Sequence, residues 1–250
     1  MIHLKTREEI EIMRECGKKL TASIEELLPS IKAGVTTLEI DQEAERLIIK
    51  NGAESSFNKV PGYKWSTCIC INEQAVHTPP SERVVKDGDI LTLDIGAYDN
   101  GYHTDYATTF VVGGTTSPKI EHFLKTGRET LDKAIKEAQE GNYLGQISQV
   151  MQEGIYGNGY FVMKELTGHG IGHELHEDPF VPNYLDRKVE KTMKIPSGLV
   201  IAVEVIYSMG SETIVFEKEG EWSIRSKDKS ICACFEHTIA ILDKNTSILV

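Results

Sequence analysis

The sequence predicts an α+β protein, built as one compact unit with two halves packed around a shared sheet. Helical patterns precede strand patterns, and this order occurs twice along the chain. The two stretches meet near Gly113 and Gly114, so the halves cover about residues 1–113 and 114–250 of a single domain, 1–250. No long linker divides them, and 250 residues with 40% hydrophobic side chains suffice for a sizeable core.

Three segments carry helical patterns. The first helix is expected over residues 6–28 at the surface, with Thr6 and Glu9 forming a capping-box pattern. A second should begin near Thr37 and stop at Asn51 and Gly52, and a third should cover residues 118–138. In the first helix the apolar side chains recur at roughly helical spacing: Ile10, Met13, Leu20, Ile24, Leu27 and Leu28.

Strand patterns fill two blocks of the chain. The first block covers residues 68–112. The second begins after Ile195 and runs through LVIAVEVIYSM, ETIVFEK and ACFEHTIAIL. The two halves therefore share one order of elements, although no sequence repeat relates them.

Charge and cysteine content exclude several classes of protein. A formal net charge of -11 argues against nucleic acid as the main partner, because phosphates need a basic surface. The charged N-terminus, MIHLKTREEIEIMREC, does not resemble a secretory signal, and no apolar run approaches the roughly 20 residues of a membrane span. We therefore expect a cytoplasmic protein. Two C-x-C pairs within five cysteines predict buried, reduced thiols rather than a disulfide framework.

The segment DILTLDIGAYDNGYHTDYATTFVV predicts a hairpin that carries two aspartates, Asp94 and Asp105. The aspartates oppose each other directly if the two-residue loop is Asp99-Asn100. They are diagonal neighbours if the loop is Asn100-Gly101. Both registers place the two carboxylates on the same face of the sheet. Because Asp94 lies in the apolar run ILTLDI, burying both charges is costly unless a metal cation binds there.

Two glutamates interrupt other apolar strands. Glu204 lies in LVIAVEVI and Glu236 lies in ICACFEHTI, and neither run contains a lysine or arginine that could neutralise the carboxylate. A charge in the middle of a strand needs a partner. Together with the two aspartates, these glutamates indicate a metal centre more strongly than any one residue does alone.

The segment LTGHGIGHELHEDPFVPNY places three histidines among glycines. Glycines on both sides of His169 allow the backbone to approach closely, as suits a ligand held at a tight turn. A zincin needs H-E-x-x-H, whereas the run from His173 to His176 is one residue shorter, so that mechanism is disfavoured. We expect His173 to be solvated and outside the site.

Four carboxylates and one imidazole form an oxygen-rich set without a thiolate. Such a set suits Mn(II), Fe(II), Co(II) or Zn(II) rather than a structural zinc. So many carboxylates around one divalent ion would leave excess negative charge, and two ions are the better count. A two-metal centre activates a water for attack on a carbonyl or phosphoryl group. The candidate ligands are Asp94, Asp105, His169, Glu204 and Glu236.

With these residues in place, the chain resembles the type I methionine aminopeptidases of the pita-bread metallopeptidase superfamily. The resemblance runs almost end to end, through KTREEIEIMRECGKKL, AGVTTLEID, INEQAVHTPP, LTLDIGAYDNGYHTDYATTF, TGHGIGHELHEDPFVPNY and FEHTIAIL. It implies a pita-bread fold, in which two pseudo-symmetric halves surround a curved antiparallel sheet. It also implies removal of methionine from the N-termini of peptides and nascent proteins when the second residue is small.

The resemblance further implies a role for each candidate ligand. Asp94 and Glu236 would bridge the two metal ions. Asp105 and His169 would complete the coordination of one ion. Glu204 would bind a metal and shuttle a proton as general base and general acid.

On the substrate side, the resemblance places His77 near the scissile amide. His176 would donate a hydrogen bond to the carbonyl oxygen and stabilise the tetrahedral oxyanion. An apolar lining with one thiol suits a thioether and excludes charged side chains. The methionine pocket falls on Tyr63, Cys68, Leu175 and Trp222.

Near this pocket the sequence departs from the family pattern in three places. Val205 follows Glu204 where the family usually has proline. The loop FNKVPGYKWSTC lacks the usual Gly-Phe/Tyr-Pro run before its cysteine. Thr78 stands after His77 in place of a glycine.

Three rival functions differ in domain content and metal use. An Xaa-Pro aminopeptidase would share all five ligands, but such proteins usually carry a large extra N-terminal domain for which this chain has no room. A non-catalytic binding protein on the same fold would have lost metal ligands that this sequence retains. A creatinase-like amidinohydrolase works without metal. The sequence leaves open the metal and any transient ribosome contact. It predicts a monomer, because no heptad pattern or exposed apolar helix requires a partner.

Overall fold

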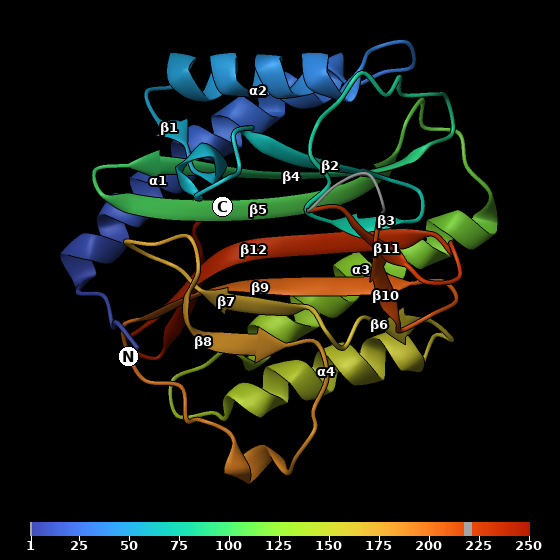
Figure 1. Ribbon diagram of the computed structural model, residues 1–250. Coiled ribbons are helices and arrows are strands. Elements are labelled where there is room, and N and C mark those ends of the chain that lie inside the picture. Colours follow the sequence, from blue (N-terminus) through green and yellow to red (C-terminus); the bar gives the residue numbers. More distant parts are fainter. Residues whose placement is uncertain (1, 218–221) are drawn as a thin grey trace.

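The computed structural model describes residues 2–217 and 222–250, which form an antiparallel sheet with helices against it (Figure 1). The α-helices are α1 (Arg7–Leu27), α2 (Thr37–Lys50), α3 (Pro118–Glu137) and α4 (Leu144–Tyr156). The main sheet contains β1 (Glu54–Ser55), β2 (Thr67–Ile71), β4 (Ile90–Asp99), β5 (Tyr102–Val111), β6 (Phe161–Val162), β7 (Thr167–Gly170), β8 (Glu177–Pro182), β9 (Leu199–Ser208), β12 (Cys232–Leu242) and β13 (Asn245–Ile248). A smaller sheet contains β3 (Gln74–Val76), β10 (Ile214–Phe216) and β11 (Ile224–Ser226).

The helix starts follow from local capping. In α1 the Thr6 side chain accepts a hydrogen bond from the Glu9 amide, and the Glu9 carboxylate accepts one from the Thr6 amide. The same capping box at Thr36 begins α2, and the Ser117 side chain caps α3. The three predicted helices are therefore confirmed. Helix α4 was missed, although its buried residues lie at helical spacing: Leu144, Ile147, Ser148, Met151 and Ile155.

Strand order in the main sheet brings the two halves of the chain together. The path runs β1-β4-β5-β12-β9-β7-β8, so β5 of the first half lies beside β12 of the second. Every strand pair along this path is antiparallel. The α+β class with a shared sheet is thus confirmed. The predicted boundary at Gly113 and Gly114 falls between β5 and α3.

The helices cover one face of the sheet. Helices α1 and α2 pack with β4 residues such as Leu91, Leu93 and Ile95, whereas α3 and α4 pack with β9 residues such as Val203 and Val205. Figure 1 shows α3 behind β9 and β12, with α1 behind β4. Because side chains alternate along a strand, residues 94 and 204 must point to the opposite face. Loops and the smaller sheet, rather than α2, α3 and α4, enclose that opposite face, and a site can form between them and the main sheet.

Among the described helices, none combines the length and the apolar character that crossing a membrane requires.

Candidate active site

The β4–β5 hairpin closes around Asn100 and Gly101, because Asp99 pairs with Tyr102. Both loop residues have positive φ, 49° and 90°, a conformation that asparagine and glycine tolerate in two-residue hairpin loops. Asp94 therefore lies opposite Ala107, and Asp105 lies opposite Gly96. Of the two registers that the sequence allows, the structure has the diagonal one. Both carboxylates lie on the face of the sheet opposite the helices.

The second half of the chain supplies the remaining candidate ligands. Glu204 on β9 and Glu236 on β12 are directly opposed across the sheet. His169 on β7 pairs with Ala202, two residues before Glu204, and so projects to the same face. Strand alternation thus gathers on one face residues that are up to 142 positions apart, since Asp94 and Glu236 belong to it (236 − 94 = 142).

One narrow cavity of about 80 Å³ joins these five residues to the predicted substrate-binding residues. The predicted residues that line it besides the candidate ligands are Tyr63, Cys68, His77, Leu175, His176 and Trp222. Phe57 and Val60 also line it, and sequence reasoning missed them because they lie in and directly after a single 3-10 turn, Phe57–Lys59, which is too short for a periodic pattern. A larger hollow of about 680 Å³, lined by Tyr156, Lys164 and Glu212 among others, contains none of the predicted site residues.

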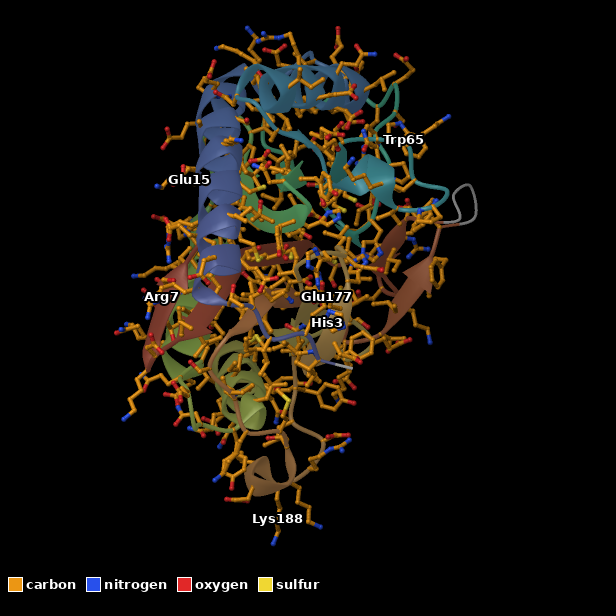
Figure 2. All side chains as sticks on the ribbon, turned by 90° about the vertical axis from the view of Figure 1, so that its left-hand side faces the viewer. His3, Arg7, Glu15, Trp65, Glu177 and Lys188 are labelled. Carbon is orange, nitrogen blue, oxygen red and sulfur yellow. The ribbon has the colours of Figure 1, made fainter. Side chains whose placement is uncertain are left out.

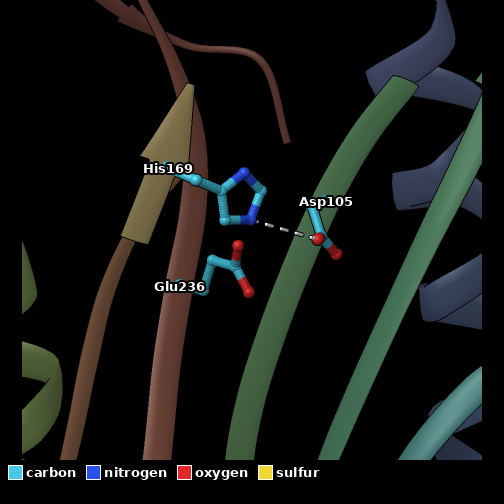
Figure 3. Close-up of side chains that lie close together, drawn as sticks. All are labelled: Asp105, His169 and Glu236. Atoms are coloured by element: carbon cyan, nitrogen blue, oxygen red, sulfur yellow. Dashed lines mark ion pairs between the residues drawn. The ribbon is translucent and has the colours of Figure 1, made fainter. Parts of the chain in front are cut away.

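Figure 3 shows the His169 ring directed toward Asp105, with the Glu236 carboxylate close by. Nε2 of His169 lies 3.5 Å from Oε1 of Glu204 and 4.0 Å from Oδ2 of Asp105. Its Nδ1 lies 2.9 Å from the carbonyl oxygen of Gly170, which leaves Nε2 as the acceptor. Burial, with the nearby His176, lowers the pKa of His169 to about 3, so the ring is neutral. A neutral imidazole that offers Nε2 suits a metal ligand rather than an ion pair.

The carboxylates are buried, and some of their oxygens have no hydrogen-bond donor within the described part of the chain. Among the described residues, none donates a hydrogen bond to Oδ1 of Asp94 or to Oε1 of Glu236. Burial and the neighbouring carboxylates raise the pKa of Asp94, Glu204 and Glu236 well above their ordinary values. Burial raises the pKa of Asp105 to about 7. Orphaned buried oxygens beside like charges fit a site that binds cations.

Two groups of side chains, drawn from the candidate ligands and Cys234, are each close enough together to hold an ion. The candidate ligand atoms of Asp105, His169 and Glu236 lie within 4.8 Å of one another. The same holds for Glu204, Cys234 and Glu236, so Glu236 belongs to both groups. The expected set had no thiolate, and Cys234 was missed. Its position two residues before Glu236 on β12 is the signal that could have found it, because such residues share a face.

The two substrate-side histidines lie at the edge of the ligand set. The rings of His176 and His169 meet edge to face, with centroids 4.4 Å apart. His77 has φ +59, a conformation that is uncommon outside glycine and that frequently marks functional sites. Burial lowers the pKa of His77 to about 4 and also lowers that of His176. Both imidazoles are therefore neutral near pH 7. His173, by contrast, is half exposed and stacks on Tyr102.

Comparison with known proteins identifies the family. The sequence profile of metallopeptidase family M24 matches residues 11–243. The chain is 41% identical to methionine aminopeptidase 1 of Bacillus subtilis, over 100% of this chain and 99% of that protein. It superposes on methionine aminopeptidase from Thermotoga maritima with a TM-score of 0.94 and 36% identity, covering 100% of this chain and 99% of the other.

The chain belongs to metallopeptidase family M24. Its pita-bread fold and its class, a metal-dependent aminopeptidase, are thereby confirmed, and the full-length relatives support methionine aminopeptidase activity. The rival Xaa-Pro activity is not favoured. A prolidase from Pyrococcus furiosus shares the fold with a TM-score of 0.79, but at 24% identity and over 98% of this chain and only 64% of its own.

In this M24 chain a cluster of three aromatic side chains, Tyr63, Trp65 and Trp222, forms one wall of the predicted methionine pocket. Tyr63 stacks edge to face with Trp222 and with Trp65, at centroid distances of 5.3 and 5.2 Å. The Tyr63 hydroxyl donates to the Thr67 carbonyl at 2.7 Å and lies 3.2 Å from Sγ of Cys68. Hydrogen bonding therefore ties the wall to β2, and the ring contacts hold its three aromatic side chains together.

A buried aspartate on α2 holds the start of β2. Oδ1 of Asp41 accepts hydrogen bonds from the amides of Ser66 and Thr67, both at 2.9 Å, and from the Thr67 hydroxyl at 2.8 Å. Sequence reasoning did not find this residue, since nothing local links position 41 to position 67. It connects the helix layer to the pocket residue Cys68.

The structure shows the surroundings of Val205 and Thr78, two of the three departures from the family pattern. Val205 is fully buried against the helix layer, and β9 continues to Ser208 with Val205 paired to Phe235. The Thr78 hydroxyl lies 2.8 Å from that of Ser223, which in turn donates to Glu217 at 2.6 Å. This chain of contacts ties the His77 loop to the strand that follows Trp222.

Proposed function

We propose that this chain hydrolyses the peptide bond after an N-terminal methionine, using two divalent metal ions. Asp94, Asp105, His169, Glu204 and Glu236 would hold the ions. The observation that supports two ions is the membership of Glu236 in both candidate groups, together with its unpartnered buried oxygen. The oxygen-rich donor set admits Co(II), Mn(II), Fe(II) or Zn(II).

When bound, the ions supply a Lewis acid and an activated nucleophile at neutral pH. The protein supplies proton transfer and hydrogen bonds. Glu204, which lines the cavity from β9, would take a proton on its carboxylate and return it to the leaving amine. His176, neutral and held against His169, is suited to donate a hydrogen bond to the developing oxyanion. His77 lines the same cavity and would contact the scissile amide.

The specificity for methionine would come from the apolar end of the cavity. Tyr63, Cys68, Leu175 and Trp222 present rings, a branched chain and a thiol, which suit a flexible thioether. Phe57 and Val60 extend the same apolar lining. Because the cavity is narrow, we further propose that the residue after methionine must be small. The substrates would be the N-termini of nascent proteins, with any ribosome contact transient.

A peptide comparison tests this proposal. Purified protein would be freed of metal, loaded with Mn(II) or Co(II), and offered Met-Gly-Met, Met-Ala-Ser, Met-Leu-Ser and an Xaa-Pro peptide. We expect release of methionine from the first two, slow release from the third and none from the Xaa-Pro peptide. Turnover of the Xaa-Pro peptide without turnover of Met-Ala-Ser would overturn the methionine assignment while leaving the metal centre intact.

A further inference from the structure

We propose that Lys5, near the N-terminus, is a positioning residue for His176 and acts through Glu177. The inference rests on the proposed function, because it assigns His176 to the reaction. It starts from a buried ion pair that the proposed chemistry does not use. Nζ of Lys5 lies 2.5 Å from Oε2 of Glu177, with side-chain exposures of only 3% and 10%.

The N-terminal segment is anchored at this point by more than one contact. The Lys5 ammonium also donates to the carbonyl oxygen of His3 at 2.9 Å, and the Lys5 amide donates to the carbonyl oxygen of Gly198 at 2.7 Å. Figure 2 shows His3 and Glu177 next to each other where this segment crosses the molecule. The contacts hold the lysine in one place before α1 begins at Arg7.

The loop that carries His176 is shaped to receive the lysine. A β-carbon at Gly172 would lie 2.3 Å from Cε and 2.6 Å from Nζ of Lys5, so any other residue here would displace the end of the lysine side chain from its present position. Glu177 also turns inward to this loop, since its Oε1 accepts a hydrogen bond from the Glu174 amide at 3.2 Å. The Lys5 ammonium and the Glu177 carboxylate thus both lie against the loop of residues 172–177.

Glu177 transmits this restraint to the site because of its place in the sheet. It directly follows His176 and is the first residue of β8, where it pairs with Gly170, the neighbour of His169. The carboxylate therefore fixes the backbone between the His176 ring and the strand that holds His169. Leu175, on the same loop, is held independently in an apolar cluster with Ile10 and Met13.

Loss of the lysine would leave a buried, unpaired carboxylate beside His176. Glu177 would then turn toward water and move the backbone that carries the imidazole. Small displacements of a positioned catalytic group lower turnover strongly, whereas the apolar pocket, and with it substrate binding, would be little changed. The structure thus predicts a loss in kcat with little change in KM.

Lys5→Met tests the inference, with Lys19→Met as matched control. Like Lys5, Lys19 forms an ion pair with a carboxylate, in this case that of Asp99. This pair lies beside the β4–β5 hairpin loop, and neither residue lines the cavity. We expect Lys5→Met to lower kcat on Met-Ala-Ser by about 10-fold or more, with KM within about 3-fold, and Lys19→Met to leave both near wild type. Lys5→Met/Glu177→Gln, which leaves no unpaired charge, should recover part of the loss.

A second readout does not depend on turnover. In metal-free protein with labelled histidine, the side-chain NMR signals of His176 should shift in Lys5→Met and not in Lys19→Met. If Lys5→Met fails to fold, Gly172→Ala is the substitute, because its methyl group displaces the same lysine. Wild-type kcat and unmoved His176 signals would overturn the inference. Failure of wild-type protein to cleave methionine peptides would instead refute the proposed function, and the NMR comparison would still decide the positioning claim.

Discussion

Asp94 and Asp105 lie diagonally across the β4–β5 hairpin, and both carboxylates point away from the helix layer. This relationship places two acidic groups in a cavity that also contains Glu204 and Glu236. Repulsion among buried carboxylates opposes folding in the absence of metal. A bound cation attracts the same carboxylates, so the electrostatic contribution of the site to folding becomes favourable.

Asp94→Asn should abolish turnover without unfolding the protein. The amide keeps the shape of the carboxylate but removes the charge that a metal ion needs, so kcat/KM should fall by about 1,000-fold or more. The metal-free variant should be more stable than metal-free wild type by about 1 kcal/mol near pH 7, because an amide is buried without the proton uptake that the raised pKa of Asp94 requires. Enzyme assays and chemical denaturation measure the two effects. Asp132→Asn, an exposed change on α3, is the control and should alter neither.

Glu204→Gln separates proton transfer from folding in the same way. The variant keeps the side-chain volume on β9 and removes one buried acid, so the metal-free variant should unfold at or slightly above the wild-type temperature. Turnover should fall by about 100-fold or more, since an amide cannot take and return a proton. A variant that retains most of its activity would show that Glu204 does not perform the proton transfer.

Trp222→Ala and Trp65→Ala compare two tryptophans that contact the same tyrosine. Both stack on Tyr63, but Trp222 lines the cavity and Trp65 does not. Loss of the lining ring should lower kcat/KM for methionine peptides by about 10- to 100-fold, mainly through KM. Trp65→Ala should cost stability with a much smaller kinetic effect. Equal kinetic losses in both variants would contradict the assigned pocket.

Removal of metal should make stability fall as pH rises. Without metal, the folded-state pKa of Asp105 is raised from 3.8 to about 7, and those of Asp94, Glu204 and Glu236 are raised as well. Raised acids favour the folded state below their ordinary pKa, and this contribution is lost as pH rises through about 7. Calorimetry of metal-free and Mn(II)-loaded protein should therefore show a Tm gap that widens by about 5 °C or more from pH 5 to pH 8. A gap that stays constant over this range would argue against a shared buried acidic centre.

The local parts of the fold could be predicted from the sequence. The capping box at Thr6 and Glu9 involves residues three apart, so its signal is complete within one short segment. Hairpin parity likewise needs only the positions of Asp94, Asp105 and the turn between them. The choice between the two registers depended on which residues take positive φ, and the sequence Asp99-Asn100-Gly101 allows both.

Features that depend on distant contacts could not be predicted. Lys5 and Glu177 are 172 positions apart, and nothing near Lys5 indicates that it is buried. Asp41 binds the start of β2 across 26 positions. Phe57 and Val60 reach the cavity from a single 3-10 turn and its C-cap, a segment too short for a periodic pattern to show which side faces inward. Family resemblance, rather than periodicity, supplied the roles of His77 and His176.

Metal stoichiometry tests the central claim most directly. Metal-free protein would be titrated with Mn(II) or Co(II) in a calorimeter, and the metal bound after dialysis would be counted by elemental analysis. We predict two ions per chain for wild type, and a loss of both high-affinity sites in Glu236→Gln, because Glu236 belongs to both groups of candidate ligands. Binding of no ion, or of two ions unaffected by Glu236→Gln, would contradict the account.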